Sequence, residues 1–140
     1  MIPTILFACI HNSGRSVAAA KLTQLYAEGR ARVLSAGSEP GTTVNPAVAH
    51  VLAERRVSTA DHVPTLLDAS LVERCDVVVT MGCGETCPVF PGKRYEDWDI
   101  ADPKGKSIED VRRIVDDVDG RVRSLLTELL PDLVLPPVTR

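Results

Sequence analysis

The sequence predicts a single α/β domain built on an open, parallel, four-stranded sheet with helices on both faces. Short apolar runs alternate with helical patterns along the chain, which is typical of parallel strands joined by crossover helices. The run at 76–81 is continuous and β-branched, as in a strand that is covered on both faces. A length of 140 residues with 44% hydrophobic residues suits one globular domain with a proper core.

The strands are expected where apolar residues run without helical spacing. The first of them ends immediately before a cysteine, and the second leads into Ser35-Ala36-Gly37. The four expected strands are residues 4–8, 32–35, 76–81 and 93–96. Because the carboxyl ends of parallel strands meet at one edge of a sheet, a ligand site is expected there.

The helices are indicated by apolar spacing and by capping residues. Residues 17–28 form the first helix, which ends at Gly29 and turns Ala18, Leu22 and Leu25 toward the sheet. Three later helices start at good N-cap positions. These positions are Asn45 before Pro46, Asp68 before a short helix, and Ser107 before a long amphipathic helix that Pro131 stops.

The domain is expected to cover residues 1–130, and residues 131–140 form a tail along the surface. No linker, repeat or low-complexity tract interrupts it. The net charge of −3 without a basic stripe argues against nucleic acid as a partner. No apolar run is long enough to cross a membrane, and Met1-Ile2-Pro3 leads directly into a strand, so a cytoplasmic protein without a signal peptide is expected.

The stretch around which the chain is organised lies between the first strand and the first helix. Its residues are Cys9, Ile10, His11, Asn12, Ser13, Gly14, Arg15 and Ser16. A loop that enters a helix N-terminus points backbone N–H groups at an anion, and an arginine clamps two of its oxygens. The same positive surroundings favour the thiolate of Cys9, the nucleophilic form of a cysteine. Ser16 can hydrogen-bond that thiolate, and Asn12 can fix the loop backbone.

The spacing of Cys9 and Arg15 is weak evidence alone, because a buried cysteine and a surface arginine would give the same pattern. The strand before, the helix after, the internal asparagine and the following Ser16 favour an oxyanion site. The loop is neither a Walker A motif nor a dinucleotide-binding fingerprint.

A second group of cysteines follows the strand at 76–81. Cys83 and Cys87 stand in a glycine-containing loop on the same sheet edge as Cys9, which suits thiol–disulfide exchange. Zinc is the main competing interpretation, but the pair supplies only two of four ligands, so no metal site is expected. Inert thiols are the remaining possibility. Cys75 enters an apolar strand and is expected to be a small buried hydrophobic residue.

The pattern of Cys9, Arg15 and Ser16 near the N-terminus resembles the phosphate loop of the low-molecular-weight protein tyrosine phosphatases, and equally that of the arsenate reductases built on the same fold. Asp102-Pro103 before the last helix matches the general-acid loop of both groups, which implies that Asp102 protonates the leaving oxygen. Asp97 and Asp99 are less favoured candidates for the acid. The simplest interpretation without a function is that this acidic segment is an ordinary solvated loop.

Two features favour the reductases. Cys83 and Cys87 match the two further cysteines of the thioredoxin-coupled arsenate reductases, although their spacing is shorter. Lys104-Gly105-Lys106 stands where the phosphatases carry aromatic residues that hold an aryl substrate, which favours a small inorganic oxyanion.

Other positions depart from the pattern. His11 replaces a small residue, Gly14 stands where a second cysteine is frequent, and Ala20 replaces a potassium ligand of some relatives, so no potassium is expected. His62 is expected to be a solvated loop residue.

The resemblance implies an arsenate reductase that acts as a monomer, holds no tightly bound cofactor and takes electrons from thioredoxin. Cys9 attacks arsenate, Cys83 attacks Cys9 with release of arsenite, and Cys87 passes the disulfide to an accessible Cys83–Cys87 pair.

Three alternatives stay open. A protein tyrosine phosphatase would use Cys9, Arg15 and Asp102 alone. A non-enzymatic regulator would bind an oxyanion or a metalloid with its thiols. A reductase of the same reaction could instead take electrons from a low-molecular-weight thiol with a glutaredoxin-like protein.

Overall fold

The sheet places Cys9 at its carboxyl edge, between the ends of two other strands. A computed structural model describes residues 2–82 and 91–137. Its strands are β1 (Thr4–Cys9), β2 (Arg32–Gly37), β3 (Val77–Met81) and β4 (Arg94–Asp97), all parallel, in the order β2-β1-β3-β4. Cys9 is level with Gly37 on one side and with Met81 on the other. The predicted open parallel four-stranded sheet is confirmed.

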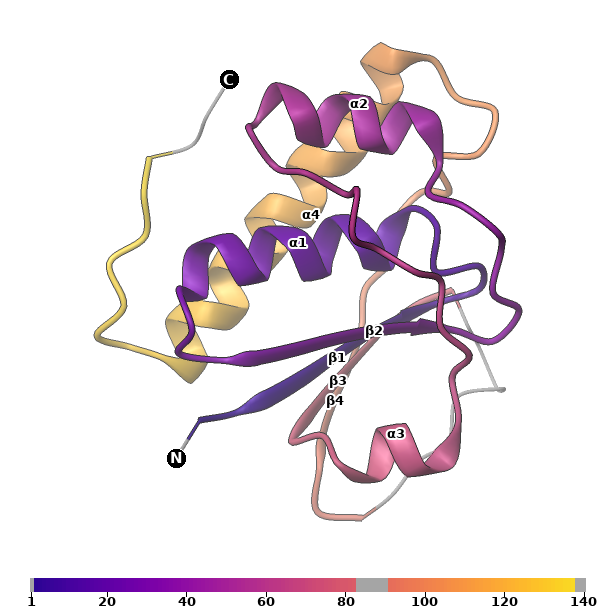
Figure 1. Cartoon of the computed structure of the whole chain (residues 1–140). Helices are drawn as coiled ribbons and strands as arrows, with labels where there is room; N and C mark the ends of the chain where they lie inside the picture. Colours follow the sequence, from indigo (N-terminus) through magenta and orange to yellow (C-terminus); the bar gives the residue numbers. More distant parts are fainter. Residues whose placement is uncertain (1, 83–90, 138–140) are drawn as a thin grey trace.

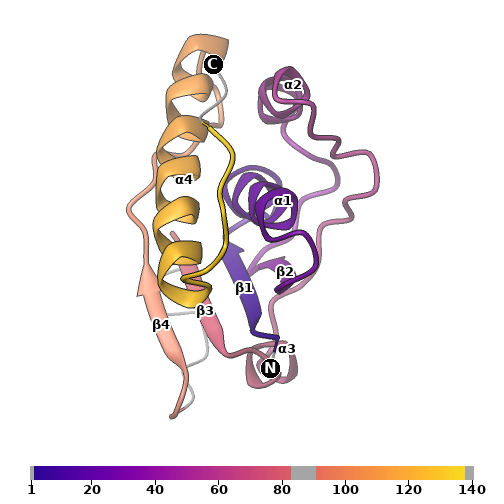
Figure 2. The same cartoon turned by 90° about the vertical axis from the view of Figure 1, so that its left-hand side faces the viewer.

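Helices cover both faces of this sheet, as the sequence predicts. The helices are α1 (Arg15–Ala27), α2 (Pro46–Glu54), α3 (Ala69–Glu73) and α4 (Ile108–Leu129). Helices α1 and α4 pack on one face with α2 beside them, whereas the short α3 lies on the other face (Figures 1 and 2).

Alternation along β1 divides the core into two parts. Ile5, Phe7 and Cys9 point to the α1 and α4 side, and Leu6 points to the α3 side. All four side chains are buried, as expected for a central strand covered on both faces.

One expected core residue of α1 is on the surface. Leu25 is 47% exposed, so the prediction that it faces the sheet is wrong. The buried stripe of α1 advances in steps of four through Ala18, Leu22 and Tyr26, and Leu25 falls at its flank.

Three of the predicted helix starts carry side-chain caps. Asn45 accepts hydrogen bonds from the N–H groups of Ala47 and Val48, and Asp68 and Ser107 cap α3 and α4 in the same way. Each cap satisfies donors that have no partner inside the helix.

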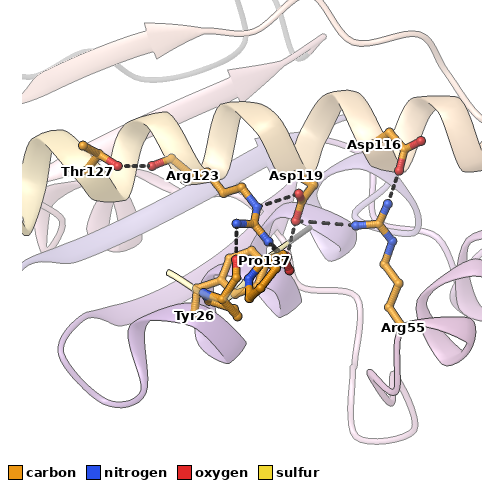
Figure 3. A network of polar contacts seen from close by, with 8 residues as sticks. Tyr26, Arg55, Asp116, Asp119, Arg123, Thr127 and Pro137 are labelled. Atoms are coloured by element: carbon orange, nitrogen blue, oxygen red, sulfur yellow. Dashed lines mark hydrogen bonds and ion pairs between the residues drawn. The ribbon is translucent and has the colours of Figure 1, made fainter. Parts of the chain in front are cut away.

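Residues 131–137 run back beside α4 and α1 (Figure 2). A polar network that includes Arg123 holds Pro136 and Pro137 (Figure 3). Arg123 of α4 donates to Asp119 at 2.8 Å and also to the carbonyl oxygen of Pro136 at 2.5 Å. Tyr26 of α1 donates to the same Asp119, whose carboxylate also pairs with Arg55. The network therefore joins α1, α4, the end of α2 and the tail.

No helix within residues 2–82 and 91–137 combines the length and apolar character needed to cross a membrane.

Candidate active site

The Cys9 side chain ends β1 inside a closed hydrogen-bond arrangement. It is 2% exposed, and its Sγ lies 2.9 Å from Ser16 Oγ and 3.3 Å from the backbone nitrogen of Asn12. A sulfur that faces a hydroxyl and a backbone N–H is placed to accept from both as a thiolate.

Asn12 holds the loop in an unusual backbone conformation. Its φ of 51° lies in the left-handed region, which asparagine tolerates better than most residues. The side chain is fully buried, donates to Ser16 Oγ at 2.8 Å and accepts from the N–H of Thr65 at 3.0 Å. Asn12 thus links the loop to a distant segment and orients the hydroxyl beside Cys9.

Arg15 begins α1, so its guanidinium and the helix N-terminus share one side of the loop. The guanidinium donates to the carbonyl of Ile100 at 3.3 Å. Gly82, directly after β3, has a φ of +92°, and a Cβ built there would lie 2.8 Å from Arg15 Nη1. The absence of a side chain at Gly82 therefore leaves the space that the guanidinium occupies.

The Ser35-Ala36-Gly37 run packs directly against the loop. A Cβ at Gly37 would lie 2.5 Å from the carbonyl oxygen of Ile10. The N–H groups of Ser38 and Glu39 donate to the carbonyls of Cys9 and Ile10 at 3.2 and 2.7 Å.

His11 lies on the exposed rim of the loop. Its Nδ1 lies 2.9 Å from the carbonyl oxygen of Glu39, and its own carbonyl accepts from Ser13 Oγ at 3.1 Å and from the N–H of Gly41 at 2.9 Å. The backbone of the loop between Cys9 and Arg15 is thus held from the β2 side.

A cavity of about 320 Å³ opens above the loop. It is lined by Cys9, His11, Ser13, Gly14, Arg15, Gly41, Thr42, Thr43, Val44, Asn45, Pro46, Asp102, Pro103 and Lys104. No Phe, Tyr or Trp side chain is among these described lining residues. The walls thus suit a small polar ligand better than an aryl group.

Asp102 reaches this cavity from the segment between β4 and α4. Its Oδ1 accepts from the N–H of Lys104 at 3.0 Å, and Pro103 packs so closely on Gly14 that a Cβ there would lie 2.8 Å away. Of the two alternative acids, neither lines the cavity, and Asp97 accepts from Thr80 Oγ1 at 2.7 Å. Asp102 is the acid of this segment that lies beside the Cys9 loop.

The other cysteines fall into two groups. Cys83 and Cys87 lie outside the described residues. Cys75 is 1% exposed in the smaller core with α3, as predicted, and burial raises the pKa of its thiol, which favours the protonated form.

The sequence prediction missed the part played by His62. It is half-buried, and its Nε2 lies 2.8 Å from the carbonyl oxygen of Asn12, so the expectation of a solvated residue is wrong. The contact spans fifty positions of the chain, and no local pattern reveals it.

Within the described residues, no group of three or more metal-binding side chains is close enough to hold an ion. The described site contains instead a thiol, a guanidinium, backbone donors and a carboxyl group around one small cavity.

The sequence matches a family model described as low molecular weight phosphotyrosine protein phosphatase over residues 4–134. It is 32% identical over 131 residues to a putative arsenate reductase of Halobacterium salinarum, and the match covers 90% of this chain and 92% of the relative.

Two solved structures extend the likeness. A thioredoxin-dependent arsenate reductase of Corynebacterium glutamicum superposes with a TM-score of 0.82 at 39% identity, covering 91% of this chain. This chain spans only 62% of that neighbour. An arsenate reductase of Archaeoglobus fulgidus superposes with a TM-score of 0.75 at 34% identity, covering 87% of this chain and 98% of the neighbour.

Proposed function

Because the chain belongs to the low molecular weight phosphotyrosine protein phosphatase family, we propose that it uses the family's phosphate loop to reduce arsenate to arsenite. The observation that carries this proposal is the small cavity that Cys9, Arg15 and Asp102 share, with no Phe, Tyr or Trp among its described lining residues. The likeness to two arsenate reductases at 34% and 39% identity supports the same choice.

In the first proposed step, arsenate binds between the backbone donors of residues 10–16 and the Arg15 guanidinium. The Cys9 thiolate forms a bond to arsenic, and an arsenic–oxygen bond breaks with loss of water. Asp102 supplies a proton to the leaving oxygen. Arsenic stays pentavalent at this stage, because substitution at arsenic moves no net electrons.

In the second step, the Cys83 thiolate attacks the sulfur of Cys9. The sulfur–arsenic bond breaks, and its electron pair passes to arsenic, which leaves as trivalent arsenite. Cys9 and Cys83 are then oxidised to a disulfide. Two electrons are gained by arsenic and two are lost by the thiols, so the step is balanced.

In the last step, Cys87 attacks Cys83 and frees the Cys9 thiolate. The resulting Cys83–Cys87 disulfide is reduced by a dithiol protein, for which thioredoxin is the proposed electron donor. The thioredoxin-dependent neighbour of Corynebacterium glutamicum supports this choice of partner.

The test is arsenate-dependent consumption of NADPH with thioredoxin and thioredoxin reductase. Wild type is compared with Cys83→Ser, Cys87→Ser and the control Cys75→Ala, which removes a thiol buried in the smaller core. Sustained turnover in wild type and the control, lost in both serine variants, supports the cascade.

Cleavage of an aryl phosphate by all four proteins, without arsenate-dependent NADPH consumption, would replace the proposal by a phosphatase. Turnover by Cys87→Ser at the wild-type rate would contradict the last step alone.

A further inference from the structure

The segment at 61–65 contacts the active-site loop at Asn12. His62 Nε2 lies 2.8 Å from the carbonyl oxygen of Asn12, and the N–H of Thr65 donates to Asn12 Oδ1 at 3.0 Å. The Asn12 side chain also donates to Ser16 Oγ at 2.8 Å. The position of this segment therefore affects the orientation of the hydroxyl beside Cys9.

The connection at 57–67, which follows α2 and contains this segment, is anchored at its two ends. At its far end, the backbone of Thr65 and Leu67 hydrogen-bonds to Gly37 at 2.8 Å. At its near end, Val57 is buried. Between these anchors the chain is largely exposed, with Val63 73% exposed.

One ion pair ties this exposed stretch to α1. The Nζ atom of Lys21 lies 2.7 Å from Asp61 Oδ1, and the Lys21 side chain is 14% exposed against 81% for Asp61. The largely covered Lys21 side chain therefore belongs to the body of the protein, and the exposed carboxylate belongs to the segment that contacts Asn12. The hydrogen bond and charge of Lys21 lower the pKa of Asp61, so the carboxylate is charged at neutral pH.

We propose that Lys21 and Asp61 are positioning residues of the active site. Their ion pair holds the segment at 61–65 where His62 and Thr65 fix the left-handed conformation of Asn12, and Asn12 in turn orients Ser16 toward Cys9. Neither residue lines the cavity above the Cys9 loop. The proposal rests on the proposed function only in taking Cys9 as the nucleophile of an oxyanion-binding loop.

The size of the effect follows from the exposure of the pair. An exposed ion pair contributes little to global stability, so removing it should leave the fold intact. Its expected contribution is to keep the segment in position. An ion-pair free energy of about a few tenths to one kcal/mol corresponds to about a two- to five-fold change in oxyanion affinity.

The experiment measures the rate at which iodoacetamide alkylates Cys9, in the full chain carrying Cys83→Ser and Cys87→Ser, with the labelled peptide identified by mass spectrometry. Inorganic phosphate is the probe, and the measured quantities are the phosphate concentration that halves the rate and the pH profile of alkylation. Asp61→Asn, Lys21→Met and their double variant are compared with Lys21→Arg.

A matched control is the exposed pair of Arg30 and Asp132, with 2.8 Å between Nη2 and Oδ1, which does not line the cavity. We expect about two- to five-fold weaker protection by phosphate in Asp61→Asn and in Lys21→Met, with a shifted pH profile. We also expect no further loss in the double variant, recovery in Lys21→Arg, and no change in Asp132→Asn.

Unchanged protection in the two single variants would overturn the proposal, and so would an equal loss in Asp132→Asn. A loss that follows a fall in melting temperature, or that Lys21→Arg does not restore, would also contradict positioning by the ion pair. Because alkylation and phosphate binding require no arsenate turnover, these outcomes are separate from failure of the proposed reductase activity.

Discussion

Single side chains around Cys9 depend on one another for their hydrogen bonds. Asn12 orients Ser16, and Ser16 faces the sulfur at 2.9 Å. The left-handed φ of Asn12 is therefore part of the arrangement that holds the Ser16 hydroxyl beside Cys9.

Asn12→Ala should weaken the site strongly. It removes two buried hydrogen bonds and leaves alanine in a left-handed conformation that costs about 1–2 kcal/mol. Together with the lost hydrogen bonds, of about 1 kcal/mol each, this cost corresponds to a fall in kcat/KM for arsenate of about a hundred- to a thousand-fold. Asn12→Gly separates the two causes, because glycine keeps the backbone conformation and loses only the side chain. Full activity in Asn12→Ala would refute the role given to this residue.

Asp102→Asn should slow the chemical step and spare oxyanion binding. A general acid contributes about a hundred-fold or more to the rate, and asparagine supplies no proton to the leaving oxygen. We expect kcat to fall to that extent, whereas protection of Cys9 by phosphate stays within about two-fold of wild type. Asp99→Asn is the control, since Asp99 does not line the cavity. Equal rates in the two variants would remove Asp102 from the mechanism.

The strand-to-helix connections bring the parts of the site together. Helix α1 begins with Arg15, and the chain leaves β3 at Gly82 beside the guanidinium of that residue. The position of Arg15 is thus set by the element that precedes it and by the end of a neighbouring strand.

Gly82→Ala tests that contact. The new methyl group would lie 2.8 Å from Arg15 Nη1, so the guanidinium must move, and the affinity for phosphate should fall several-fold. Gly92→Ala is a matched control, because its φ of +84° gives similar backbone strain while nothing lies within 4 Å of the new Cβ. Equal phosphate affinity in the two variants would show that the close approach of Gly82 to Arg15 does not contribute to phosphate binding.

The elements that are defined by local chemistry could be predicted from the sequence. Asn45, Asp68 and Ser107 cap helices as expected, because a cap needs only its own neighbours. The exposure of Leu25 could not be predicted, because a helical pattern does not say how wide the buried stripe is.

The candidate site likewise has a part that could be predicted from the sequence and a part that could not. The loop from Cys9 to Ser16 is continuous in the sequence and was therefore recognisable, whereas His62 joins it through a contact with a backbone carbonyl. Backbone acceptors have no residue signature, so such a partner becomes visible only in the folded chain.

At the scale of the whole molecule, the network of Tyr26, Asp119 and Arg123 joins α1 to α4 (Figure 3). Burial raises the pKa of Tyr26, and its hydrogen bond to Asp119 acts in the same direction. The folded state thus prefers the protonated phenol, and stability is lost as pH rises from about 10, where the unfolded tyrosine ionises, toward the folded value.

Tyr26→Phe should destabilise the protein and remove this component of alkaline sensitivity. Loss of the hydroxyl leaves a buried carboxylate with fewer partners, at a cost of about 1–3 kcal/mol. Urea unfolding of wild type and Tyr26→Phe at pH 8 and at pH 10.5 measures both effects. We expect the difference between the two proteins to shrink at the higher pH. A difference that grows with pH would contradict the direction of the Tyr26 pKa shift.

The central claim is that thiols of this chain reduce arsenate, and a single turnover without thioredoxin tests it most directly. Fully reduced wild-type protein is mixed with excess arsenate, and arsenite and free thiols are counted. We predict one arsenite per chain, the loss of two thiols, and a Cys9–Cys83 disulfide in Cys87→Ser. Retention of all thiols without arsenite, together with hydrolysis of an aryl phosphate, would contradict the claim.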